Sequence, residues 1–307
     1  MLKEFRPALI LLMALSILTG MLYPALVTGV AKVAFANASD GSLLESDGRI
    51  VGSRLIGQHF SDPKHFWGRP SATSPMPYNA ASSGGSNQGP LNPALAEAVN
   101  VRGPRLLAEA VAEIDAEIMH LSTNYVFDGE RELGAFYTAD DEALPINNYG
   151  ETKLAGEQAV IASAPKSYIV RTSWVFGAGK ENFFSNAARS LAAGKPVRAV
   201  NDLWASVTYV SDLAARVSEL LSLRRYGTFQ VVNGGVCSHY EFAQELARSL
   251  NVDGDALIES ISDAEAKRLA RRPRNTPMRC LMSEELGLAP MQPWQAVLPQ
   301  FLSDLKA

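Results

Sequence analysis

Cysteine and histidine are scarce in this chain, and neither is spaced as a metal site requires. The 307 residues include two cysteines, Cys237 and Cys280, and four scattered histidines. Because no C-x-x-C pair occurs, neither a zinc site nor a redox motif is indicated, and we expect buried free thiols. The formal net charge of −4 lacks the basic surplus of nucleic-acid-binding proteins. A chain of this length favours about two domains.

A glycine-rich phosphate-binding turn is also missing. The chain has 23 glycines, but neither G-x-G-x-x-G nor G-x-x-G-x-x-G occurs. The nearest cluster, Gly84, Gly85 and Gly89, lies among Ser, Asn and Pro residues without a strand before it or a helix after it. Since a nicotinamide cofactor rests its pyrophosphate on such a turn at a helix N-terminus, the sequence offers this group no visible site.

One long apolar run stands near the N-terminus. Residues 7–31 contain no charge, and a bilayer needs about 20 apolar residues. Lys3 and Arg6 precede the run, which favours a cytoplasmic N-terminus. A cleaved signal peptide is the alternative, since residues 34–36 (Ala-Phe-Ala) resemble a cleavage site, but the run exceeds the usual apolar core of about 7–15 residues. We therefore expect an uncleaved, single-pass anchor over residues 1–35, in the inner (cell) membrane.

The segment after the anchor resembles a known membrane protein. The strings Gly52-Ser53-Arg54-Leu55-Ile56-Gly57-Gln58, Phe66-Trp67-Gly68-Arg69-Pro70-Ser71-Ala72, Tyr78-Asn79 and Ser83-Gly84-Gly85-Ser86-Asn87 follow the apolar run. By these strings, residues 1–98 resemble the N-terminal half of KdpC, the C subunit of the bacterial potassium-transporting P-type ATPase. The resemblance implies one membrane helix, a partial extracytoplasmic domain over residues 36–98, and partners among the pump's membrane subunits. Such subunits assist the pump and do not hydrolyse ATP.

The remaining chain alternates between helical and β-rich patterns. Asn92-Pro93 is a helix start, with Asn as the cap, and Gly103-Pro104 should kink or interrupt that helix. Strands alternating with helices predict an α/β fold with a parallel sheet. The predicted strands are 118–122, 167–171, 197–200 and 227–232; the predicted helices are 149–161, 183–193, one up to 250 after the capping box Ser238/Glu241, one after the similar pair Ser262/Glu265, and 293–305.

Thr123, Tyr149 and Lys153 form the candidate catalytic group. Tyr149 and Lys153 are four residues apart at a predicted helix start, so they share one face. A cation beside a phenol lowers its pKa, which suits proton transfer near neutral pH. The Thr123 hydroxyl, at the end of the preceding strand, can hold a carbonyl oxygen beside that phenol. This set is suited to ketone reduction, with the hydride supplied by a cofactor.

Residues 99–307 resemble a reductase family. They are similar to dTDP-4-dehydrorhamnose reductase (RmlD), an extended short-chain dehydrogenase/reductase, without its N-terminal cofactor-binding third. The strings that carry the resemblance are Leu121-Ser122-Thr123-Asn124-Tyr125-Val126-Phe127-Asp128-Gly129, Asn148-Tyr149-Gly150-Glu151-Thr152-Lys153-Leu154-Ala155-Gly156-Glu157, Arg171-Thr172-Ser173-Trp174-Val175-Phe176 and Arg271-Arg272-Pro273-Arg274-Asn275. The resemblance implies a truncated Rossmann-like, doubly wound parallel sheet with a C-terminal substrate subdomain.

The reductase resemblance also implies residue roles. Tyr149 is the proton donor to the C4 carbonyl of a nucleotide sugar, and Lys153 tunes Tyr149 and bonds the nicotinamide ribose of NADP(H). Thr123 orients the carbonyl, and Trp174 lines the sugar pocket. Asn124 stands where the family usually has Asp, which removes a charge next to Thr123.

Three functions follow as hypotheses for a chimeric chain. The first is NADPH-dependent reduction of dTDP-4-dehydro-6-deoxy-L-mannose in dTDP-L-rhamnose biosynthesis, impaired by the absent glycine-rich loop. The second is a membrane accessory role in a potassium pump, and the third is a fusion without function. The lost strands would leave the strand ending at Ser122 as an open sheet edge. An anchor with its N-terminus inside would place residues 36–307 outside the cytoplasm, away from NADPH.

Overall fold

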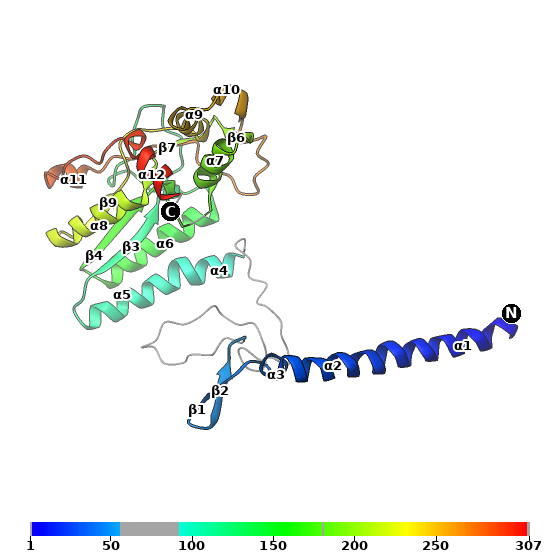
Figure 1. The fold of residues 1–307 in the computed structure, drawn as a ribbon. Coiled ribbons are helices and arrows are strands. Elements are labelled where there is room, and N and C mark those ends of the chain that lie inside the picture. The colour runs from blue at the N-terminus through cyan, green and yellow to red at the C-terminus, as the bar shows by residue number, and fades with distance from the viewer. Residues whose placement is uncertain (1, 56–91, 180, 306–307) are drawn as a thin grey trace. The chain divides into compact units, whose positions relative to one another are not determined.

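The structure, a computed structural model, describes residues 2–55, 92–179 and 181–305. The chain divides into two compact units, Met1–Gln88 and Gly89–Ala307, and each is described here by itself (Figure 1). The predicted features between residues 56 and 91, which include most of the KdpC-like strings, lie outside the described residues.

The first unit begins with a long apolar helix. Helix α1 (Leu2–Ile17) continues through a π-helical turn (Leu18–Leu22) into α2 (Tyr23–Ala34). The stretch Phe5–Ala34 contains an 18-residue window with a mean hydropathy of 2.1, and none of that window is buried, so the helix is long and apolar enough to cross a membrane. After the short helix α3 (Ala36–Ser39), strands β1 (Leu43–Ser46) and β2 (Arg49–Ser53) pair as an antiparallel hairpin.

The second unit opens on a helix whose start was predicted. The Asn92 side chain accepts a hydrogen bond from the Ala94 N–H at 2.9 Å and caps α4 (Pro93–Glu97). A π-helical turn (Ala98–Arg102) follows, and then α5 (Gly103–Glu113). The predicted interruption at Gly103-Pro104 takes the form of this π-helical turn, which ends at Arg102. The chain stays helical through it, because Pro104 lies in the first turn of α5, where its missing N–H is tolerated.

Three parallel strands form the central sheet in the order β3–β4–β9 (Figure 1). They are β3 (Ile118–Thr123), β4 (Ser167–Thr172) and β9 (Gly227–Gln230). Helices α5 and α6 (Asn148–Ser163) cover one face, where Ala108 and Val160 pack on Ile169. Helix α8 (Val210–Leu223) covers the other face, where Leu213 and Leu220 pack on β4 and β9. The predicted α/β fold with a parallel sheet is confirmed.

A second core lies beyond the carboxyl ends of these strands. Its centre is Phe176, whose ring packs against Phe184, Phe242 and Phe301 at centroid distances of 5.7, 5.1 and 5.1 Å. The elements around it are β5 (Val175–Phe176), α7 (Phe183–Ala192), β6 (Val197–Val200), β7 (Trp204–Ala205), β8 (Thr208–Tyr209), α9 (His239–Leu250), α10 (Gly254–Leu257), β10 (Ile258–Ile261), a 3-10 turn (Trp294–Val297) and α12 (Leu298–Asp304). Strand β11 (Asn275–Thr276) pairs with β7, and helix α11 (Leu281–Glu285) packs against β9.

The two predicted capping pairs differ in outcome. Ser238 and Glu241 form a full capping box at the start of α9. Ser262 and Glu265 make the same reciprocal hydrogen bonds, but a turn follows and not a helix. The predicted helix after Ser262 is therefore wrong, since the local bonds stabilise an isolated turn as well as a helix end.

Strand β3 is an edge strand within the described part of the chain, as predicted for the strand that ends at Ser122. It pairs with β4 alone. The Ile118 N–H donates to the Lys166 carbonyl at 3.0 Å on the β4 side. Because backbone groups alternate in direction along a strand, those of Met119 and Leu121 face the free edge.

Candidate active site

Thr123 and Tyr149 meet at the carboxyl end of β3. Thr123 is the last residue of that strand, and Tyr149 lies in the first turn of α6, which Asn147 caps by accepting from the Gly150 N–H at 2.8 Å. A Cβ atom at Gly150 would overlap the Tyr125 carbonyl oxygen, so glycine lets the helix start approach the turn after β3. Thr123 also lies near enough to the Tyr149 hydroxyl to lower the pKa of that phenol.

The phenol of Tyr149 is in its protonated form at neutral pH. Burial of part of the ring raises its pKa above the usual 10, and the hydrogen bond with Thr123 lowers it in part. Tyr149 is still 49% exposed, so a ligand can reach it. The expectation that Lys153 lowers this pKa is corrected: burial outweighs any such effect, and the Lys153 ammonium is bound elsewhere.

Lys153 is bound to the free edge of the sheet. Its ammonium donates to the Leu121 carbonyl oxygen at 2.6 Å and lies 3.4 Å from Nε2 of His120. Burial lowers the pKa of Lys153, and Glu157 opposes that shift. Burial and the neighbouring Lys153 lower the pKa of His120 to about 4, so His120 is neutral at pH 7.

Asn124 connects the site to the C-terminal region. It is 2% exposed, and both the oxygen and the nitrogen of its carboxamide form hydrogen bonds. The Thr123 hydroxyl donates to Oδ1 at 3.3 Å, and Nδ2 donates to the Thr276 hydroxyl at 2.7 Å. A carboxylate at this position could accept from both hydroxyls, so Asn124 preserves the connections that the family's Asp would make while removing its charge.

Trp174 follows the neighbouring strand end. Thr172 and Thr123 are paired across β4 and β3, so Trp174 emerges at the same sheet end as Thr123. Its φ of +37° is rare for a side chain of this size and typical of functional sites. Its ring lies 4.0 Å from the ring of His239 and 6.2 Å from that of Phe184, so it is a supported aromatic platform.

His239 supports this platform, and sequence reasoning assigned it no role. Burial, with smaller contributions from Arg268 and Arg272, lowers the pKa of His239 to about 3. The imidazole behind Trp174 is therefore neutral. No spacing in the sequence marked His239, because its partners are about 65 residues before it and about 30 residues after it.

A buried ion pair fixes α6 to the sheet beneath the site. Nε of Arg171 donates to Oε1 of Glu157 at 3.0 Å, and a terminal nitrogen donates to Oε2 at 2.7 Å. The Arg171 guanidinium also lies 5.2 Å from the Phe127 ring. Glu157 is one turn after Lys153, so this pair sets the rotation of the helix that carries Tyr149 and Lys153.

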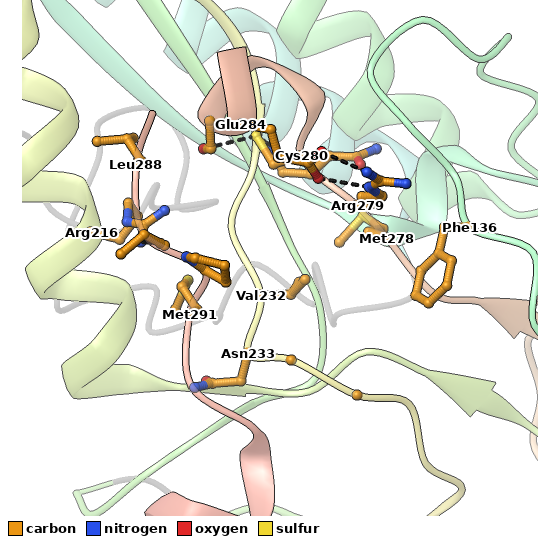
Figure 2. A pocket seen from close by; sticks show the side chains of 16 residues that line it. Phe136, Arg216, Val232, Asn233, Met278, Arg279, Cys280, Glu284, Leu288 and Met291 are labelled. Atoms are coloured by element: carbon orange, nitrogen blue, oxygen red, sulfur yellow. Dashed lines mark hydrogen bonds and ion pairs between the residues drawn. The ribbon is translucent and has the colours of Figure 1, made fainter. Parts of the chain in front are cut away.

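A well-defined cavity in the described residues lies apart from this site. It has a volume of about 520 Å³ and lies beside β9 and α11. None of the four predicted site residues lines it. Figure 2 shows Arg216 and Met291 on one side of it and Phe136 on the other, and Arg279 is paired with Glu284 at its rim. The catalytic group is instead an open surface at the sheet end.

A dinucleotide cofactor fits these residues only in part. Tyr149 and Lys153 lie at the strand end where a nicotinamide ribose would contact them, and Tyr149 is exposed enough to do so. The pyrophosphate needs backbone N–H groups of a glycine-rich turn, and none of the 23 glycines lies in such a motif. The described residues therefore offer no glycine-rich turn for the pyrophosphate.

Two protein families match this chain. The RmlD substrate binding domain family matches residues 76–307, and the family described as the K+-transporting ATPase c chain matches residues 5–124. Both matches include residues 76–124. The KdpC subunit of Dechloromonas aromatica is 69% identical over 97 residues, which are 32% of this chain and 51% of that protein.

The reductase relatives match the later part of the chain. A dTDP-4-dehydrorhamnose reductase of Mycolicibacterium smegmatis is 38% identical over 208 residues, 67% of this chain and 63% of that protein. The solved reductase of Bacillus anthracis, in complex with NADP, is 33% identical with a TM-score of 0.64 and covers 69% of this chain and 74% of its own. The chain thus spans about half the length of the KdpC relatives and less than two thirds of the M. smegmatis reductase.

Proposed function

Because the chain belongs to the RmlD family over residues 76–307, with a KdpC-like segment before it, we propose that its second unit binds a nucleotide sugar and presents Tyr149 as a proton donor. The sugar is of the dTDP-4-dehydrorhamnose class, after the names of the reductase relatives. The observation that carries the proposal is the position of the half-exposed Tyr149 phenol beside Thr123, at the carboxyl end of β3.

Each side chain of the site has a role in this proposal. The Thr123 hydroxyl would turn from Asn124 to the C4 carbonyl oxygen of the sugar and hold it beside the Tyr149 hydroxyl. Tyr149 would donate its proton to that oxygen as a hydride from NADPH reaches C4. Trp174 packs against the sugar, and its ring is held by His239 and Phe184. Asn124 orients the Thr123 hydroxyl through a 3.3 Å bond.

The reductive half of the reaction is impaired in this proposal. NADPH supplies the hydride in reductases of this kind, and this chain lacks the turn that holds its pyrophosphate. Lys153, the residue proposed to bond the nicotinamide ribose, is bound to Leu121 and not free. The chain therefore keeps the proton-donating and sugar-binding side of the site and lacks the cofactor side.

Calorimetric titration with dTDP-L-rhamnose tests the sugar-binding side. The full chain in detergent should bind this reduced sugar nucleotide, and Trp174→Ala should weaken binding about tenfold or more, because stacked aromatic area contributes about 1–2 kcal/mol. Leu223→Ala, at an exposed position at the end of α8, should bind as the unaltered chain does. Equal affinities for the Trp174→Ala and unaltered chains would refute the assignment of Trp174, and no binding at all would refute the proposal.

A second candidate function rests on the first unit. The 69% identity to a KdpC subunit and the apolar helix Phe5–Ala34 support docking against the membrane subunits of a potassium-transporting ATPase. With Lys3 and Arg6 before the helix, the proposed orientation has the N-terminus in the cytoplasm and residues 36–307 outside. That orientation separates the reductase-like unit from cytoplasmic NADPH, which agrees with an impaired reductase.

Co-purification tests this accessory role. The full chain should co-purify with the other pump subunits, and a variant with residues 5–34 replaced by an unrelated membrane helix should not. Equal recovery of pump subunits with both proteins would contradict the role. Fusions of a reporter active only in the cytoplasm should be silent at the C-terminus, and an active C-terminal fusion would contradict the orientation.

A further inference from the structure

The free edge of β3 has the features of a strand-docking site. Its outward backbone groups belong to Met119 and Leu121, since the Ile118 N–H points to β4. The Leu121 side chain is 51% exposed, whereas Met119, on the same face, packs against the core beneath α8. The apolar face beneath α8 thus extends to the edge of the described sheet, where Leu121 is left partly uncovered.

We propose that this edge accepts a separate polypeptide: the N-terminal strand–turn–helix portion of a dinucleotide-binding domain, which adds a parallel strand and the missing glycine-rich turn. The proposal rests on the proposed function, because it completes the same site. In a doubly wound sheet the strand next to the fourth is the first, and the turn after the first strand holds the pyrophosphate. The parallel order β3–β4–β9, in which strands consecutive along this part of the sheet lie side by side, matches strands four, five and six of that fold. The edge of β3, unpaired within the described residues, is therefore where the first strand would pair.

The comparisons and the sequence favour this partner over a second copy of the chain. The chain covers 74% of the NADP-containing B. anthracis reductase, which leaves about a quarter of that fold to be supplied. A second copy lacks a glycine-rich turn as this chain does, so it could cover the edge without completing the site. The partner is therefore defined by its chemistry, an apolar parallel strand followed by a pyrophosphate-binding turn.

Lys153 connects docking to cofactor binding. Its ammonium donates a hydrogen bond to the Leu121 carbonyl oxygen at 2.6 Å. That oxygen is one of the acceptors that an added strand requires. A backbone N–H of the partner would take over this acceptor, and Lys153 would then be free for the ribose hydroxyls. Docking thus releases the side chain that the cofactor needs, four residues after Tyr149.

The test uses the full chain in detergent and a defined probe. The probe is the N-terminal segment of the M. smegmatis reductase that precedes its match to this chain, fused to a soluble carrier and labelled with a fluorophore. Anisotropy should show saturable binding to the unaltered chain and none with the carrier alone. Leu121→Pro should weaken binding about tenfold or more, because it removes an edge-facing N–H. Leu121→Thr keeps that N–H and should bind within about threefold.

Two further measurements make the outcome decisive. Near-ultraviolet circular dichroism checks that Leu121→Pro keeps the fold; if it does not, slower amide exchange at Met119 and Leu121 on probe binding to the unaltered chain decides instead. Absence of probe binding, or equal binding to Leu121→Pro and Leu121→Thr when both are folded, overturns the docking site. Probe binding and NADPH binding without sugar reduction would contradict the proposed function and leave the docking site standing.

Discussion

At the scale of single residues, the site is defined by which partner each polar group has. Thr123 lies beside Tyr149, and hydrogen bonds join Thr123 to Asn124 and Asn124 to Thr276, so polar contacts run from the phenol into the protein interior. Lys153 stands outside this chain, on the Leu121 carbonyl. The phenol is accordingly a proton donor whose pKa depends on burial and Thr123 more than on a neighbouring cation.

Thr123→Val should raise the pKa of Tyr149 further. The substitution removes the hydrogen bond that lowers the pKa and leaves the burial that raises it. The measurement is an NMR pH titration of the chain with carbon-13 at the tyrosine Cζ, with Tyr149→Phe to assign the signal. A Tyr149 pKa below 10 in the unaltered chain would contradict this account and restore Lys153 as the dominant influence.

Sequence patterns predicted the positions of the site residues in the fold better than they predicted the contacts of those residues. The strand end at Thr123 and the helix start at Tyr149 follow from local signals, and so does their meeting at one sheet end. The position of Lys153 does not follow, because it depends on an acceptor that is free only when the sheet edge is open. Trp174 was assigned by resemblance, whereas its left-handed backbone and its His239 support arise from packing between segments far apart in sequence.

At the scale of secondary structure, α6 is the element that determines the site. It carries Tyr149 and Lys153, and two glycines allow its close packing. Gly150 lies against the Tyr125 carbonyl, and Gly156 lies against the Asn100 carbonyl of the π-helical turn. Asn100 also donates to the Thr152 hydroxyl at 3.0 Å. The contacts with the π-helical turn therefore hold α6 in position. No periodic pattern in the sequence predicts this turn; the only local signal was Pro104, which indicated a break in the helix.

Gly156→Ala should destabilise the second unit by about 1–3 kcal/mol, because the added methyl group overlaps a backbone carbonyl that cannot move independently of its helix. Gln158→Ala, two residues away on the exposed face, should change the free energy of unfolding by less than about 0.5 kcal/mol. Urea unfolding of both variants in detergent, followed by tyrosine and tryptophan fluorescence, makes the comparison. Equal stability of the two variants would show that α6 and the π-helical turn are not closely packed.

At the scale of the whole chain, two family segments meet without a complete copy of either. The KdpC-like part spans about half of its relatives, and the reductase-like part spans 63% of the M. smegmatis protein. The described sheet accordingly ends at β3, with one neighbour for a strand that a doubly wound fold places between two. The fold class and the parallel sheet were predictable from the alternation of strand and helix patterns in the sequence. The bond of Lys153 to the Leu121 carbonyl at the open edge of β3 was visible only in the structure.

The most direct test of this account is steady-state oxidation of NADPH by the purified full chain with dTDP-4-dehydrorhamnose, followed at 340 nm. The account predicts no saturable turnover, because the pyrophosphate of NADPH has no glycine-rich turn to bind in this chain. Saturable turnover by the chain alone, lost in Tyr149→Phe, would contradict it by showing that the chain holds its own hydride donor.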